Sequence, residues 1–173
     1  MYAFLTQLIG WTGTVLYVGS FQFKNSRRMA LCAVLGALSY VIHYFMLGAF
    51  AGSISLLISM FGNFLVACSG RRWSDWKLWP PLLVAAYAIA TAVTWQGALS
   101  LLPCAVSALK SWVYFSRNGK VIRLTCLCIV SPGWMVYNVI TGSISGLVCE
   151  LFVSGSILVS ILRYGIKALD EVT

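Results

Sequence analysis

The sequence predicts an all-α integral membrane protein whose seven transmembrane helices form two three-helix repeats separated by one linker helix. Three observations predict this fold class. The 173-residue chain is 60% hydrophobic and only 9% charged, whereas a soluble domain of this size needs more charge to cover its surface. Seven apolar stretches each approach the roughly 20 residues that a spanning helix requires. The basic residues between these stretches occupy every second loop.

The apolar stretches follow one another with almost no residues left for a soluble domain. The first has no basic segment before it and no clear small-residue cleavage site after it, so we expect a retained helix rather than a signal peptide. The fourth begins at Pro80-Pro81, where a helix start tolerates proline, and lacks strongly polar side chains until Gln96. The expected spans are 2–23, 29–48, 51–69, 80–96, 100–116, 121–140 and 142–163.

The charge distribution predicts the orientation in the membrane. The net charge of +8 would suggest nucleic-acid binding in a soluble protein, but here most basic residues lie in alternate loops and in the tail. The loops near 47–52, 95–100 and 140–142 carry no basic residue. Cytoplasmic loops are rich in Lys and Arg, so we expect the N-terminus outside, the C-terminus in the cytoplasm, and no nucleic-acid partner. The basic residues are Lys24, Arg27, Arg28, Arg71, Arg72, Lys77, Lys110, Arg117, Lys120, Arg123, Arg163 and Lys167.

A shift of 94 positions aligns the two halves of the chain. Residues 21–32 lie over 115–126, and residues 39–48 lie over 133–142. Few residues are identical, but the pattern of aromatic end, basic turn, aromatic-polar patch and uncharged glycine turn recurs. We therefore expect a single membrane domain over residues 1–173, with repeats at 2–69 and 100–163 and a linker helix at 80–96. Two three-helix units separated by one helix are parallel repeats, a plan that transporters use.

Several short motifs carry a resemblance to a known family. They are Leu101–Pro103, the S-W-x-x-F pattern of Ser111–Phe115, the Y-N-x-x-x-G-S-I-x-G pattern of Tyr137–Gly146, and Glu150 followed by Ser154-Gly155-Ser156. With these motifs the chain resembles the YgjV family of bacterial inner-membrane proteins over nearly its whole length. That family looks related to the SWEET and PQ-loop transporters, so the resemblance implies the inner membrane and a 3+1+3 helix arrangement. It implies no particular activity.

One feature of the PQ-loop transporters is missing from this sequence. Their Pro-Gln pair is absent, because Pro103 is followed by Cys104 and the equivalent position in the first stretch is Ile9. We therefore expect no proline hinge in the first repeat.

Two charged residues lie inside the expected helices. A charge at the centre of a spanning helix costs about 2.5–3.5 kcal/mol on insertion scales, so such residues are candidates for function. Glu150 lies about 12 Å from the outer end of its helix at a rise of 1.5 Å per residue, on a face with Ser143, Gly146 and Ser154. Lys110 lies at a similar depth, about 15 Å.

The sequence leaves three arrangements open for these charges. Glu150 and Lys110 form an ion pair that only holds the helices together, or the same pair forms a substrate or proton site. In the third arrangement, Lys110 extends to the cytoplasmic surface and Glu150 is neutral.

Five further polar or aromatic residues are candidates for a binding site. The only histidine, His43, is either a hydrogen-bonded structural residue or a proton-sensing group. Asn63 and Asn138 either bridge helices by hydrogen bonds or bind hydroxyl and amide groups of a solute. Tyr40 and Trp134 are candidates to flank the site, although aromatic residues at helical spacing more often pack.

These observations favour a transporter of a small polar solute that works by alternating access between the two repeats. The alternative is a receptor or regulatory protein on the same fold that binds a ligand without moving it. No catalytic constellation, metal cluster or cofactor motif is present, so we expect no enzyme and no cofactor. Membrane lipid is an expected partner, with an interfacial tryptophan strip at Trp73, Trp76 and Trp79; whether two chains associate stays open.

Overall fold

The computed structural model describes residues 2–20, 26–68, 70–116 and 118–164, and within them all regular structure is helical. Helices α6 and α7 are joined without a break by the π-helical turn η2, so residues 119–141 form one rod and the described chain has seven helices. The elements are α1 Tyr2–Ser20, α2 Ser26–Met46, α3 Phe50–Ala67, α4 Trp79–Val93, the 3₁₀ turn η1 Ala98–Ser100, α5 Leu101–Phe115, α6 Gly119–Thr125, η2 Cys126–Val130, α7 Ser131–Thr141 and α8 Ile144–Tyr164.

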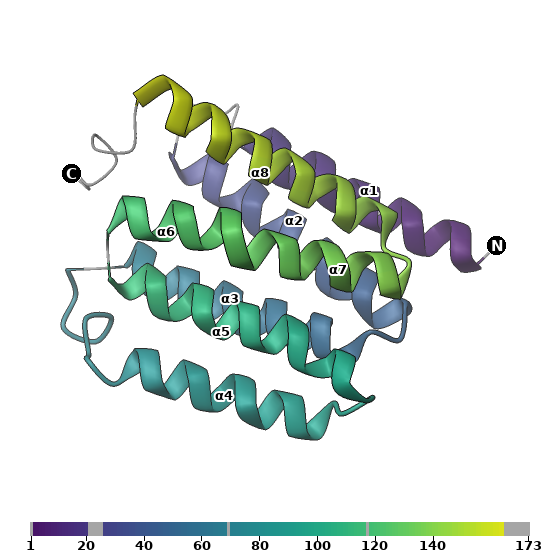
Figure 1. The fold of residues 1–173 in the computed structure, drawn as a ribbon, viewed down its shortest axis with the longest axis horizontal. Helices are drawn as coiled ribbons and strands as arrows, with labels where there is room; N and C mark the ends of the chain where they lie inside the picture. Colours follow the sequence, from purple (N-terminus) through teal and green to yellow (C-terminus); the bar gives the residue numbers. More distant parts are fainter. Residues whose placement is uncertain (1, 21–25, 69, 117, 165–173) are drawn as a thin grey trace.

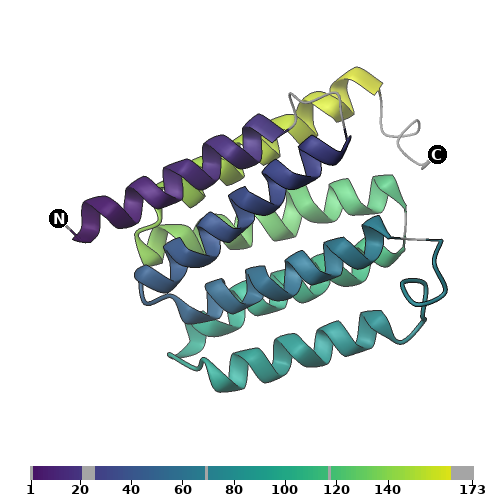
Figure 2. The same ribbon diagram turned by 180° about the vertical axis from the view of Figure 1, so that it is seen from behind.

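The seven helices lie side by side and run back and forth between two ends of the molecule (Figures 1 and 2). The N-terminus and the turns after α2, α4 and α7 lie at one end, and the C-terminal end of α8 lies at the other. Six rods form a closed ring in the order α1, α2, α3, α5, α6–α7 and α8, with α8 packing back on α1. Helix α4 lies outside this ring against α3 and α5.

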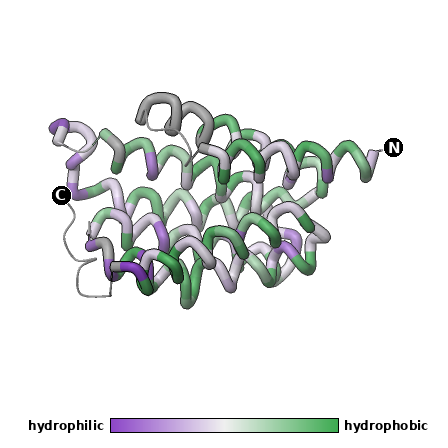
Figure 3. Tube along the Cα trace, turned by 90° about the horizontal axis from the view of Figure 1, so that it is seen from above, coloured by the Kyte–Doolittle hydropathy of each residue, from purple (hydrophilic) through white to green (hydrophobic). Residues whose placement is uncertain are grey.

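The described helices have the composition of membrane spans. Three are long and apolar enough to cross a membrane by length and composition, at 98–115, 120–141 and 144–163. Three shorter apolar helices cover 34–46, 50–66 and 79–93. Large hydrophobic side chains cover the outer surface, as at Phe4, Val93 and Leu162, and a water-facing surface rarely carries so much apolar area. Figure 3 shows hydrophobic residues along the rods and hydrophilic ones mainly towards the end where the C-terminus lies.

The seven predicted helices are confirmed, but two differ in detail. Helix α4 ends at Val93 rather than at residue 96, because the chain turns at Gly97, whose φ of 110° is a left-handed conformation that favours glycine. The sixth helix contains the π turn η2 just before Pro132. Proline cannot donate the helical hydrogen bond, and its ring clashes with the carbonyl four residues earlier. A π turn at this point widens the backbone and lets the rod continue.

Small residues let helices α1 and α2 approach closely. Helices α1 and α2 cross at Gly13 and Gly36, and a Cβ atom built on Gly36 would lie 2.8 Å from the backbone nitrogen of Tyr17. Small residues at a helix crossing let two backbones approach closely. Any residue larger than glycine at this crossing would force α1 and α2 further apart.

Polar loops gather at the end of the bundle opposite the N-terminus. Arg71, Arg72 and Lys77 lie in the turns between α3 and α4, Lys120 lies in the first turn of α6, and Arg163 lies in the last turn of α8. Of the basic residues on which the predicted orientation depends, Lys24, Arg117 and Lys167 lie outside the described residues. The described part of the pattern puts the charged loops at one end of the molecule.

Candidate functional site

A cavity of about 670 Å³ lies inside the ring of six rods. Each of these rods contributes to its wall, whereas none of the lining residues comes from α4. Small-molecule sites typically occupy about 300–1,000 Å³ and combine an apolar wall with a few polar groups. The cavity is therefore large enough for a small solute.

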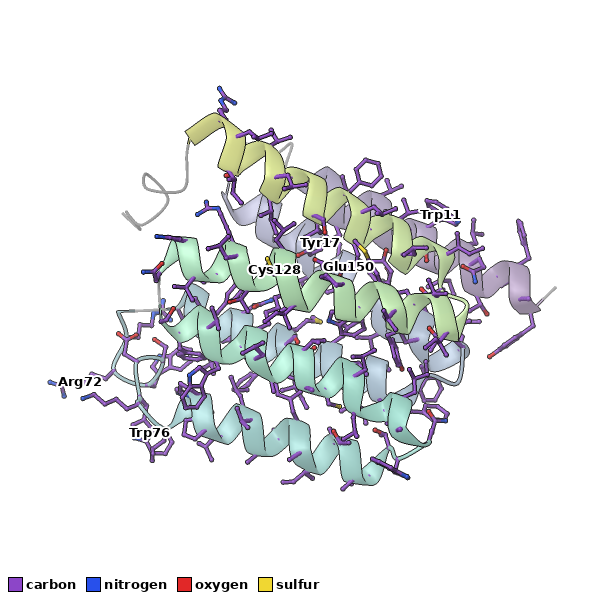
Figure 4. The ribbon with its side chains drawn as sticks, viewed as in Figure 1. Trp11, Tyr17, Arg72, Trp76, Cys128 and Glu150 are labelled. Atoms are coloured by element: carbon purple, nitrogen blue, oxygen red, sulfur yellow. The ribbon has the colours of Figure 1, made fainter. Side chains whose placement is uncertain are left out.

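The cavity wall carries both intramembrane charges. Lys110 on α5 and Glu150 on α8 line it, together with Asn63 on α3. Figure 4 shows Glu150 and Tyr17 in the interior of the bundle, with Trp76 at its edge. These three polar groups come from three different helices of the ring.

The two charges do not neutralise each other directly. Among the described residues, neither Lys110 nor Glu150 makes an ion pair within 4.0 Å, so the ion pair considered from the sequence does not form. The Lys110 ammonium instead lies 5.5 Å from the centroid of the Tyr114 ring, a cation–π contact. Ser131 is next to the Glu150 carboxyl group and lines the same wall. Both charges are half-buried, with access to the cavity.

Four buried aromatic residues, here called the aromatic layer, close the cavity towards the N-terminal end. They are Tyr40, Tyr44, Trp134 and Tyr137. The ring centroid of Tyr44 lies 6.1 Å from that of Tyr40, 5.7 Å from that of Trp134 and 6.0 Å from that of Tyr137. From this layer the cavity extends towards the end with the basic loops, where Asn63, Tyr114 and Arg123 line it.

Hydrogen bonds between the two halves of the chain surround the aromatic layer, and we call this set the interhalf clamp. The Tyr44 hydroxyl donates to Asn138 Oδ1 at 2.5 Å, and the Tyr40 hydroxyl donates to the Ser145 carbonyl at 3.1 Å. His43 Nε2 lies 2.8 Å from Ser143 Oγ. Each bond joins α2 to the second half of the chain at the N-terminal end of the bundle.

His43 is fully buried in the clamp rather than in the cavity wall. Its Nδ1 lies 2.7 Å from the carbonyl oxygen of Thr6, which can only accept, so Nδ1 carries the proton. In the neutral ring Nε2 then accepts from the Ser143 hydroxyl, whose oxygen accepts in turn from the Gly146 N–H at 3.2 Å. All these groups are satisfied with a neutral imidazole.

The structure brings five of the seven predicted site residues to the cavity. Tyr40, Asn63, Lys110, Trp134 and Glu150 line its wall, whereas His43 and Asn138 do not. Asn138 is buried behind the wall and is hydrogen-bonded to Tyr44, which lines the cavity. These two residues join helices, one of the two roles that the sequence left open for each.

The comparison with known proteins identifies a family. A family model described as Imp-YgjV, bacterial inner membrane protein, matches residues 4–167. The chain belongs to this family. No curated protein and no solved structure matched the chain. Membership in the YgjV family of inner membrane proteins agrees with the three long apolar helices, and the relation to SWEET and PQ-loop transporters stays a prediction.

Other cavity residues of this YgjV-family chain were not predicted from its sequence. Ser107 is 1% exposed and lines the cavity, yet within the described part of the chain its hydroxyl has no hydrogen-bond partner. Helical spacing could have found it, because Ser107 and Tyr114 lie three residues before and four residues after Lys110, on the same helix face. Tyr44 likewise follows Tyr40 by one turn. Ser131 likewise precedes the candidate Trp134 by three residues within α7.

Proposed function

We propose that this protein is a non-enzymatic transporter of a small polar solute that works by alternating access between two three-helix repeats. The observation that carries the proposal is the cavity inside the ring of helices, whose wall holds Lys110 and Glu150 without a direct ion pair. Polar and ionisable residues within membrane helices are costly and usually mark a solute or ion pathway. Repeats at 2–69 and 100–163 and a linker at 80–96 would form the moving parts.

The order of helices in the ring supports two parallel repeats. The ring has the order expected of two repeats related by a two-fold axis. If α1, α2 and α3 are exchanged with α5, α6–α7 and α8 respectively, every pair of neighbouring rods becomes another pair of neighbouring rods. The outlying α4 has the position expected of a linker. Residues 21–25, which belong to the first aligned segment, lie outside the described residues.

Contacts between α2 and α7 support the same arrangement. The 94-residue shift pairs Tyr44 with Asn138, and these two residues are hydrogen-bonded to each other. It also pairs Tyr40 with Trp134, and both line the cavity. Equivalent positions meet in this way close to a two-fold axis, where a surface contacts its own copy. An axis along the membrane normal between α2 and α7 would relate the repeats.

The charged loops support an orientation with their end of the bundle in the cytoplasm. Trp73 and Trp76 are about half exposed beside these loops, as expected of side chains at the lipid headgroups. In this orientation the chain crosses the inner membrane several times, and the cavity extends towards the cytoplasm. The aromatic layer and the interhalf clamp would then close the outer side and separate when the transporter faces outwards.

A receptor on the same fold is the second candidate. The clamp favours it, because a cavity closed on one side by hydrogen bonds can bind a ligand without releasing it across the membrane. A receptor would bind solute in this cavity and show no flux in either direction.

Flux in proteoliposomes tests the proposal. The purified full chain is reconstituted, and uptake is measured for a panel of labelled amino acids, sugars, organic acids and amines. We expect saturable uptake of at least one solute class that Glu150→Gln and Lys110→Ala abolish. Lys77→Ala, a change of an exposed loop lysine, is the matched control and should leave uptake intact. Uptake that survives both cavity variants would contradict the site, and binding without uptake would favour the receptor.

A further inference from the structure

The cavity wall carries one positive and one negative side chain, on different helices, that are available to a ligand. Lys110 is on α5 and Glu150 is on α8, and the α6–α7 rod packs against both of these helices. Neither makes an ion pair within 4.0 Å among the described residues. Arg123 also lines the cavity but already makes an interaction of its own. Two opposite charges therefore remain for a bound solute.

We infer that the cavity binds a zwitterionic α-amino acid with an apolar side chain, with its carboxylate at Lys110 and its ammonium group at Glu150. A charged side chain within membrane helices is costly unless an opposite charge or a polar group compensates it. A solute with a single charge would neutralise one wall group and leave the other, and a neutral sugar would neutralise neither. A zwitterion satisfies both groups at once.

The side of the cavity near Lys110 offers a second donor for a carboxylate. The Ser107 hydroxyl is almost completely buried, lines the cavity and has no hydrogen-bond partner among the residues that the structure describes. Buried polar groups in native proteins are nearly always hydrogen-bonded, so this hydroxyl points to a ligand acceptor. Ser107 precedes Lys110 by three residues, which puts both donors on one face of α5.

The wall that carries Glu150 also suits an ammonium group and an apolar side chain. Tyr40, Tyr44 and Trp134 line the cavity with Glu150, and aromatic faces attract cations. Most of the remaining wall is apolar, including Leu56, Met60, Val130, Phe152 and Val153. A solute with one charged end and an apolar body matches this distribution.

Binding of the amino acid does not require that the protein transports it, and only movement of the solute rests on the proposed function. Binding is therefore measured first. The purified full chain is titrated with L-leucine, L-methionine and L-phenylalanine, and binding is followed by calorimetry. Two analogues of leucine each remove one charge: 3-methylbutylamine lacks the carboxylate and 4-methylpentanoate lacks the ammonium group. We expect at least one of the three amino acids to bind. If leucine binds, each of its two analogues should bind at least tenfold more weakly than leucine. If another amino acid binds instead, the corresponding amine and carboxylic acid analogues of that amino acid are used.

Variants of the two charges should change the preference in opposite directions. Lys110→Met should weaken amino-acid binding at least tenfold and favour the amine. Glu150→Gln should weaken it similarly and favour the carboxylic acid. Ser107→Ala should weaken binding of the amino acid and the acid roughly tenfold, since hydrogen bonds to charged groups contribute about 1.5–3 kcal/mol, and should spare the amine. Lys77→Met and Ser154→Ala, which change residues outside the cavity wall, are the matched controls.

The comparison of ligands on the unaltered protein stays decisive if a charge variant fails to fold. Equal binding of the amino acid and a singly charged analogue, or binding of none of the three amino acids, would overturn the inference. Amino-acid binding with no flux would overturn the transport proposal and leave this inference standing. Flux of a neutral sugar that both charge variants leave unchanged would overturn the inference and leave transport standing.

Discussion

Removing the Tyr44 hydroxyl tests whether the aromatic layer is the outer gate. In the structure this hydroxyl donates to Asn138 Oδ1 at 2.5 Å, and the Asn138 side chain is 1% exposed. Tyr44→Phe keeps the ring contacts but leaves that oxygen buried without this donor, which costs roughly 1–3 kcal/mol. If the outward-facing state solvates Asn138, the cost applies only to the closed state. The equilibrium should then shift towards opening by about 5- to 150-fold.

Cys149 provides the assay for this shift. It is buried, packs with the aromatic layer and lines the cavity. In a variant with Cys149 as its single cysteine, a membrane-impermeant maleimide added outside spheroplasts should react slowly. Tyr44→Phe should raise the labelling rate about 5-fold or more. Tyr2→Phe, the same chemical change at an exposed position, is the control.

Unchanged labelling of Cys149 in Tyr44→Phe would refute the reasoning, provided that a permeant maleimide still labels both variants equally. In that case the layer would not separate during the working cycle, and the clamp would be purely structural.

Three further predictions concern stability and flux. Gly36→Ala should lower the free energy of unfolding in detergent by about 1–3 kcal/mol, because its Cβ would lie 2.8 Å from a backbone nitrogen of α1. The control Gly19→Ala, whose Cβ would meet nothing within 4 Å, should have little effect. An equal loss of unfolding free energy in both variants would contradict the close crossing of α1 and α2. His43→Ala should lower the thermal unfolding temperature, since it leaves two partners buried, and an unchanged temperature would argue against the clamp. Glu150→Gln should abolish solute uptake while leaving thermal unfolding near that of the parent protein, and loss of both would point to a structural carboxylate.

The sequence predicted the helices well, because they depend on local patterns. Hydropathy and loop charge mark helix positions, and a rise of 1.5 Å per residue sets depth. Lys110 and Glu150 lie inside α5 and α8, as the hydropathy pattern predicted. Lys110 and Glu150 are separated sideways because the α6–α7 rod packs between α5 and α8 in the ring. A matched depth was therefore not enough to predict a direct ion pair.

The two residues that lie away from the cavity show a second limit. His43 and Asn138 are on the inner faces of α2 and α7, as polar residues in membrane helices should be. An inward side chain lines the cavity if it lies on one side of the aromatic layer and joins the interhalf clamp if it lies on the other side. The outcome therefore depends on where along the helix the aromatic layer lies. That position results from packing among Tyr40, Tyr44, Trp134 and Tyr137, which come from both halves of the chain and carry no local signal of contact.

The π turn is also a tertiary feature. Pro132 indicates a disturbance in the sixth helix, but a kink, a break and a π turn all relieve the same clash. The observed turn carries Cys126, Val130 and Ser131 on the cavity wall. The π turn packs against both α5 and α8.

The most direct test of transport is counterflow in proteoliposomes. Vesicles that contain the full chain are loaded with unlabelled solute at high concentration, and a trace of the same labelled solute is added outside. Alternating access predicts that labelled solute accumulates transiently above its equilibrium level, and that Lys110→Ala removes this overshoot while Lys77→Ala retains it. Binding of labelled solute without any overshoot in the unaltered protein would contradict transport by alternating access.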